Sequence, residues 1–211
     1  YREMIDIWER SMTPFTGIFC VGLAEVMYEW NRMDEAEANA WKGYEIGKKQ
    51  GSGKVIAPAA VLLSKIYAVK YSIDRSVDFL QKTKADLLNN QFHFWADIVE
   101  AQILRLTLER MASSDLESWV ENWYWILDED IPPNHLFQVL TLIRVLISLE
   151  RWDEAAYWLA HVQRITERLD RLGERIETLM LLGLLYKRKK QMKRAVRYVS
   201  EALVLAEPEQ Y

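Results

Sequence analysis

The stretch Tyr28-Glu-Trp-Asn-Arg-Met-Asp-Glu-Ala36 and the stretch Leu149-Glu-Arg-Trp-Asp-Glu-Ala155 share one pattern. Each begins at the end of an apolar segment, passes through a short polar turn, and continues with two acidic residues followed by alanine. Carboxylates are favoured at a helix N-terminus because the helix dipole places partial positive charge there. The pattern therefore predicts two helices joined by a tight turn, and its recurrence predicts a repeat protein.

A spacing of about 40 residues relates five copies of this pattern. Small or aliphatic residues form one column in the second helix of each pair: Ala36, Ser76, Leu116, Ala155 and Ala195. A second column, in the first helix of each pair, is wholly aliphatic: Leu23, Leu63, Ile103, Leu142 and Leu182. A third column is aromatic in four of its five members: Asn39, Phe79, Trp119, Trp158 and Tyr198. Helix pairs that cannot bury an apolar face alone share one core when stacked. The columns predict an all-α fold, a right-handed superhelical α-solenoid of about five antiparallel helix pairs.

Helix-breaking residues divide the chain between these columns. The expected helices span residues 17–31, 34–50, 55–70, 74–90, 94–111, 115–128, 135–150, 153–170, 174–189 and 191–206. The repeat domain is expected over residues 17–211, and residues 1–16 are expected to be the remnant of a preceding helix or a linker. Because the chain begins with Tyr1 and not with methionine, it is expected to be part of a longer protein.

Composition excludes several classes of protein. Half of the 211 residues are apolar and 27% are charged, which is typical of a folded soluble domain. A net charge of -4 gives no general attraction to nucleic acid or to an acidic membrane. The single cysteine, Cys20, excludes an internal disulfide framework and indicates a reducing compartment. We therefore expect a cytoplasmic protein that contacts neither nucleic acid nor membrane directly.

The segment from Leu182-Leu-Gly-Leu-Leu-Tyr186 through Ala195, Ala202 and Pro208 resembles a tetratricopeptide (TPR) unit. The period of about 40 residues is longer than the usual 34 of such units. Together with Leu23-Ala-Glu25 and the stretch that follows, this period resembles the helical region of MalT-like regulators. These are large ATP-dependent (STAND-type) transcription activators of the LuxR family.

The resemblance implies a role in sensing. In that family the helical region lies between a nucleotide-binding switch and a helix-turn-helix domain, receives a small inducer, and promotes self-association. It implies that ATP binds in another part of the parent protein, with no cofactor in this chain. A TPR-type scaffold that binds a peptide or a partner helix is the alternative function.

One further column is charged and is the predicted ligand site. Glu25, Lys65, Arg105 and Arg144 recur at this spacing, with Leu184 in the fifth copy. In a TPR stack this position faces the concave groove, so we expect the column to bind ligand with five other residues: Tyr28, Trp95, Asp97, Gln102 and Gln138. Hydrogen-bonding groups beside aromatic rings suit a sugar, a polyol or a peptide. The alternative is that the charges are solvated, or pair with one another across the stack.

Other motifs receive plainer interpretations. Most tryptophans are expected to fill space between repeats, because Trp119 and Trp158 belong to the packing column. The glycine-rich stretch 47–54 lacks the spacing and the preceding strand of a phosphate-binding loop. The basic cluster at 187–197 is expected to be a solvated helix end. The three histidines share no metal-ligand spacing and no nucleophile motif is present, so we do not expect an enzyme.

Overall fold

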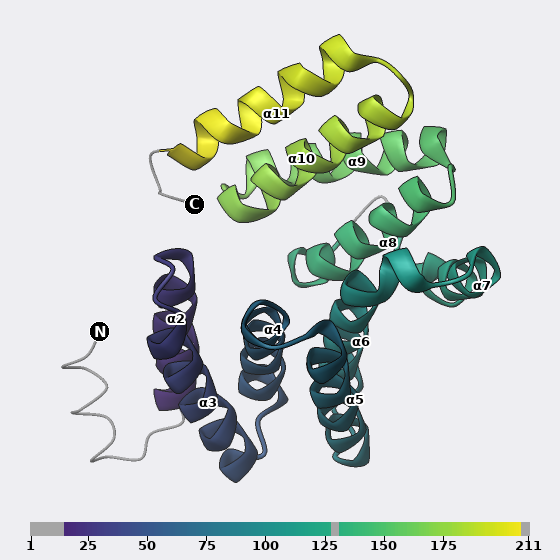
Figure 1. The fold of residues 1–211 in the computed structure, drawn as a ribbon. Coiled ribbons are helices and arrows are strands. Elements are labelled where there is room, and N and C mark those ends of the chain that lie inside the picture. Colours follow the sequence, from purple (N-terminus) through teal and green to yellow (C-terminus); the bar gives the residue numbers. More distant parts are fainter. Residues whose placement is uncertain (1–14, 128–130, 208–211) are drawn as a thin grey trace. The chain divides into compact units, whose positions relative to one another are not determined.

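A computed structural model describes residues 15–127 and 131–207, and every regular element in these two ranges is helical (Figure 1). The helices follow one another in this order: α2 (Thr16–Glu29), α3 (Met33–Gln50), α4 (Gly53–Lys70), α5 (Ile73–Asn89), α6 (His93–Thr107), η1 (Leu108–Arg110), α7 (Ser113–Trp123), η2 (Tyr124–Ile126), η3 (Pro133–His135), α8 (Leu136–Ser148), α9 (Trp152–Arg168), α10 (Leu172–Arg188) and α11 (Met192–Ala206). The prediction of an all-α, TPR-like fold is confirmed for these residues. The superhelical hand stays a prediction, and residues 1–14 lie outside the described residues.

The helices of the expected third pair end earlier than predicted. The expected helix over 94–111 gives way to the 3-10 turn η1 after Thr107, and the one over 115–128 gives way to η2 after Trp123. Sequence periodicity cannot mark these ends, because a 3-10 turn continues the same rotation with slightly tighter winding.

The chain forms two compact units, residues 1–106 and residues 107–211. In the first unit, α2 packs on α3, α3 on α4 and α4 on α5, and α2 also contacts α4 (Figure 1). In the second unit, α8 packs on α9, α9 on α10 and α10 on α11, and α8 also contacts α10. Helix α7 packs on α8. Contacts between next neighbours and between alternate helices are the pattern of stacked helix pairs.

The predicted columns lie in the interior. Every member of the small-residue column, from Ala36 to Ala195, is buried. This includes Leu116 of the third copy, which is degenerate in that leucine stands where the other copies have alanine or serine. In the first helices, Leu23, Leu63, Leu142 and Leu182 are also buried. The register inferred from the sequence is therefore confirmed in both units.

Close approach between paired helices depends on one glycine in each unit. A Cβ atom added to Gly43 of α3 would lie 2.7 Å from Cγ2 of Val21 on α2. A Cβ atom added to Gly183 of α10 would lie 2.7 Å from Cγ2 of Val199 on α11. Both units thus bring their helix backbones together at a position where no side chain fits.

Most turns repeat one local structure, the Schellman motif that commonly ends helices. In it, the residue after the helix adopts a left-handed conformation, and the next amide donates to the carbonyl five residues earlier. Arg32 N donates to Met27 O, and Arg151 N donates to Leu146 O, each over 2.9 Å or less. The left-handed residues are Asn31, Gly51, Gln91, Glu150, Asp170 and Lys190.

Aromatic rings fill the space between pairs in the first unit, as the sequence indicates. Phe79 of α5 contacts the rings of Trp41, Tyr44 and Tyr67, with centroids 5.5–5.6 Å apart. The polar atoms of this cluster are paired, because Trp41 Nε1 donates to the Tyr67 hydroxyl over 2.8 Å. The cluster therefore joins α3, α4 and α5 without leaving that indole nitrogen unbonded.

Gly43→Ala tests the close approach of α2 and α3. The added methyl group meets Val21 and the carbonyl oxygen of Gly17, so we expect a loss of about 1–3 kcal/mol in the free energy of unfolding. Gly22→Ala is the matched control, because Gly22 lies within α2 with open space around its Cβ position. There alanine improves helix propensity and should add about 1 kcal/mol. Thermal unfolding followed by circular dichroism measures both; equal changes would contradict the packing.

Glu150→Gly tests the left-handed turn between α8 and α9. Glu150 has a φ of 59°, which costs a residue with a Cβ atom about 1–2 kcal/mol. Glycine removes this cost but adds freedom to the unfolded chain, so we expect a net gain of up to about 1 kcal/mol. Gly51→Ala, at a φ of 61°, should lower stability by a similar amount, again measured by thermal unfolding. A shift of both variants in the same direction would argue against this interpretation.

Candidate functional site

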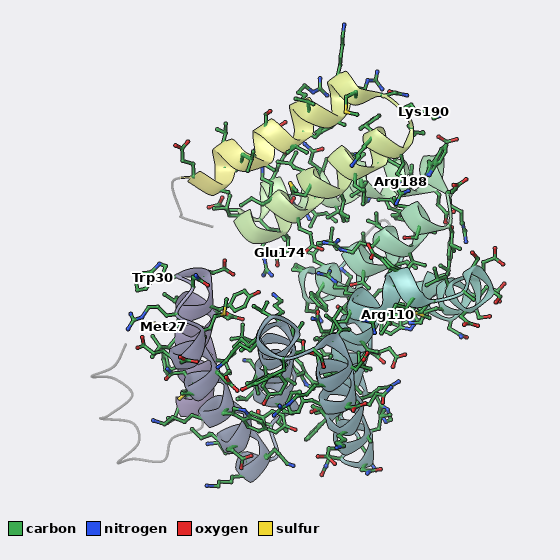
Figure 2. All side chains as sticks on the ribbon, in the orientation of Figure 1. Met27, Trp30, Arg110, Glu174, Arg188 and Lys190 are labelled. Carbon is green, nitrogen blue, oxygen red and sulfur yellow. The ribbon has the colours of Figure 1, made fainter. Side chains whose placement is uncertain are left out.

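Glu25, Tyr28 and Lys65 come together in the first unit. Glu25 and Tyr28 lie one turn apart near the C-terminal end of α2, and Lys65 lies on the neighbouring helix α4. The Lys65 ammonium lies 5.9 Å from the centre of the Tyr28 ring, within the range of a cation–π contact. Figure 2 shows Met27 and Trp30 at the same end of α2, where Met27 is buried and Trp30 is exposed. The predicted column thus forms one cluster here, which we call the α2–α4 cluster.

The electrostatics of this cluster are finely balanced. Burial raises the pKa of the Glu25 carboxyl, Lys65 opposes the rise, and Glu29 adds to it. Glu25 as a whole residue is exposed, so the loss of solvation concerns its carboxylate and is partial. Burial also raises the pKa of the Tyr28 hydroxyl, with a further contribution from Glu29. The cluster therefore offers an anion, a cation and a neutral hydroxyl beside one aromatic face.

Two other predicted site residues of the first unit belong to its packing. Gln102 of α6 is 3% exposed, and its Nε2 donates to Ser64 Oγ of α4 over 3.1 Å. Trp95 is half-buried against Gly53 at the start of α4. Twelve residues of helix separate Gly53 from Lys65, which is about 18 Å. The structure thus gives both residues a role in joining α6 to α4, at positions apart from the α2–α4 cluster.

Asp97 and Arg105 are half-buried on α6. Asp97 acts on Lys84 of α5: burial lowers the pKa of the Lys84 ammonium, and Asp97 opposes this fall. Lys84 also forms an ion pair with Glu100. The charges of Lys84, Asp97 and Glu100 therefore offset one another between α5 and α6.

In the second unit, the charged column makes an ion pair between first helices. Arg144 of α8 donates from Nε and Nη2 to Glu177 Oε1 of α10, over 3.3 Å and 3.0 Å. Gln138, one and a half turns earlier on α8, is 1% exposed, and its Oε1 has no hydrogen-bond partner among the described residues. Gln138 is thus an interior residue, and Arg144 pairs with Glu177, which is not a member of the charged column.

Another kind of ion pair, which recurs in both units, was not predicted from the sequence. Lys70, at the end of α4, reaches Asp34 and Glu37 of α3, and these two carboxylates raise the pKa of the Lys70 ammonium. Lys189, just after α10, reaches Asp153 of α9 over 2.7 Å. In both cases 36 residues separate the lysine from the aspartate, so this spacing is the signal that could have revealed the contact.

The basic cluster at 187–197 is largely engaged within its own unit. Figure 2 shows Arg188 and Lys190 at the turn between α10 and α11. The guanidinium groups of Arg194 and Arg197 lie 5.3 Å and 4.8 Å from the ring centres of Tyr186 and Tyr198. Stacking of this kind holds the arginines against the helix surface.

A pocket of about 540 Å³ in the second unit was also missed. Its lining comes from the segment before α8 and from the last turns of α9: Ile131, Pro132, Pro133, His161, Arg164, Ile165 and Arg168. The sequence signal that could have found it is the pair of prolines, Pro132 and Pro133, which interrupts the helical pattern before α8.

Within residues 15–127 and 131–207, no group of histidine, cysteine, aspartate and glutamate side chains is arranged to hold a metal ion. In the same ranges no helix has the length and apolar character needed to cross a membrane. Cys20 is buried, and burial raises the pKa of its thiol.

Glu25→Gln tests the balance of charges in the α2–α4 cluster. A folded-state pKa above the unfolded value means that ionised Glu25 lowers stability at neutral pH, and that this loss disappears as the pH falls. Glutamine removes the charge, so we expect a small rise in melting temperature at pH 7. The difference should vanish well below the ordinary pKa of 4.5, where glutamate is protonated in both states. A lower melting temperature at pH 7 would show that attraction to Lys65 dominates.

Comparison with known proteins places this architecture. Residues 6–211 match the family described as the MalT-like TPR region. The HTH-type transcriptional regulator MalT of Vibrio parahaemolyticus is 22% identical over 185 residues, which are 86% of this chain and 20% of that protein. The regulator MalT of Yersinia pestis is 26% identical over 192 residues, with 87% and 20% covered. The chain spans about a fifth of the length of these relatives. It belongs to the family of MalT-like TPR regions of transcriptional regulators.

Proposed function

We propose that this chain is the ligand-sensing segment of an ATP-dependent, LuxR-type transcription regulator in the cytoplasm. A small inducer binds the exposed surface of the first helices, and its binding is relayed to nucleotide-binding and DNA-binding domains elsewhere in the parent protein. ATP belongs to those domains. Self-association of the parent is the expected consequence of sensing.

The α2–α4 cluster is the observation that carries this proposal. An inducer must contact side chains that solvent can reach. Glu25 and Lys65 are exposed and Tyr28 is half-buried, so all three meet this condition. Lys65 is held above the Tyr28 ring, and the two side chains come from successive first helices. A ligand that bridges them therefore acts on the packing of α2 against α4, which is a physical route from binding to conformation.

The chemistry of the cluster favours a sugar or a polyol. An aromatic ring flanked by charged hydrogen-bonding groups provides one face for the apolar side of a sugar ring and polar partners for its hydroxyl groups. Gln102, Gln138 and Trp95 are not part of this surface, because they serve the interior or the start of α4. Arg144 is the proposed ligand residue of the second unit, and it forms an ion pair with Glu177.

One observation favours the alternative, a scaffold for a peptide or a partner helix. Helix α11 exposes apolar side chains along one side, namely Met192, Val196, Leu203 and Val204, each more than half exposed. Such a stripe is typical of a surface that contacts another protein.

Thermal-shift screening against sugars, sugar alcohols and short peptides tests the proposal, because a ligand that binds the folded state raises the melting temperature. We expect a sugar or polyol to give a saturable shift, and Lys65→Ala to weaken its binding about tenfold or more through loss of a charged hydrogen bond. Lys82→Ala on α5, also exposed, is the control and should bind normally. Binding of peptides alone would favour the scaffold, and full affinity of Lys65→Ala would remove the α2–α4 cluster from the site.

A further inference from the structure

The connection between α7 and α8 differs from the other helix connections in the described part of the chain. Most of these contain two or three residues, such as 51–52 between α3 and α4 and 149–151 between α8 and α9. The α7–α8 connection runs over residues 124–135, of which 128–130 lie outside the described residues. Long connections in repeat proteins usually serve function, because regular stacking does not need them.

This connection builds the pocket of the second unit. Ile131, Pro132 and Pro133 form one wall, and the last turns of α9 form the other. The volume of about 540 Å³ lies within the range of 300–1,000 Å³ typical of small-molecule sites. Ile131 and Ile165 are buried, whereas Arg164 and Arg168 are exposed. The pocket therefore has an apolar floor and a cationic rim.

The two arginines at the rim lack carboxylate partners among the described residues. Arg164 Nη2 lies 2.9 Å from His161 Nδ1, a ring nitrogen that does not supply the negative charge of a carboxylate. Arg164 and Arg168 lie four residues apart on one helix face, where like charges repel each other and destabilise the helix. Two other arginines of this unit, Arg151 and Arg171, each pair with a glutamate three residues later. Among the described residues, the rim thus has two arginines that form no ion pair with a carboxylate.

We propose that this pocket binds a small amphiphilic oxyanion, a molecule with an apolar body and a phosphate or carboxylate head. The head lies between Arg164 and Arg168, whose planar guanidinium groups match the spacing of such oxygens. The body lies on Ile131, Pro132 and Ile165. The site is separate from the α2–α4 cluster and does not depend on the proposed inducer function.

Calorimetric titration of the 211-residue chain tests the proposal with hexyl phosphate, hexanoate and hexanol. We expect saturable binding of at least one of the two anions and none of hexanol. The comparison of hexyl phosphate with hexanoate identifies the preferred head group. Inorganic phosphate should bind more weakly than hexyl phosphate, because it lacks the apolar body that the floor of the pocket receives.

Variants that remove equal charge decide whether the pocket holds the anion. Arg164→Gln with Arg168→Gln should weaken binding of the preferred anion at least about tenfold, since each removes a charged hydrogen-bond donor. Lys187→Gln with Lys193→Gln removes the same charge from exposed positions on α10 and α11, and should leave binding unchanged. Circular dichroism should show the same helicity in both double variants.

Two outcomes would overturn the proposal. The first is the absence of saturable binding of either anion. The second is an equal loss of affinity in the two double variants, which would indicate general attraction to positive charge.

Discussion

The close approach of helix backbones is the constraint on which the rest of the structure depends. Paired helices have small residues where they cross. In both units one of these residues is a glycine, and a Cβ atom added to it would lie only 2.7 Å from a valine methyl group of the partner helix. Short separation lets the aliphatic columns interlock, and interlocking columns fix which side of each first helix faces outward. The positions of Glu25 and Lys65 on the surface therefore follow from the contacts made by glycine and alanine in the interior.

Stacking also explains why the charged column is not a simple row of free cations and anions. Each first helix lies beside the next first helix in its unit, so a long charged side chain reaches its neighbour. Lys65 reaches the Tyr28 ring, and Arg144 reaches Glu177. Contacts between charged groups that water can still reach contribute little to stability, because water screens them. These contacts hold the side chains in place only weakly, so a ligand can displace the contacts or bridge the side chains.

The sequence predicted the helices, their order and the register, because the columns recur through many residues and each column reports burial directly. Leu116 shows the strength of this signal, since even the degenerate third copy places it in the interior. The candidate site was less predictable. Gln102 and Gln138 have polar side chains next to an exposed column, yet both are buried, because their own angular positions face neighbouring helices. Repeat spacing gives the angle of a residue on its helix, but not which neighbour covers that angle.

The same reasoning indicates where a repeat protein acquires features of its own. Regular turns such as Asn31 and Glu150 satisfy the helix ends with two hydrogen bonds and leave little surface for a ligand. A longer connection must bury its apolar residues, and Ile131 is buried and lines the same pocket as Ile165 of α9. The two prolines that follow Ile131 restrict the backbone and keep the segment from extending α8. A pocket wall formed by a connection can differ from one helix pair to the next without disturbing the stacking. The interior therefore preserves the repeat, and the connections can vary in their chemistry.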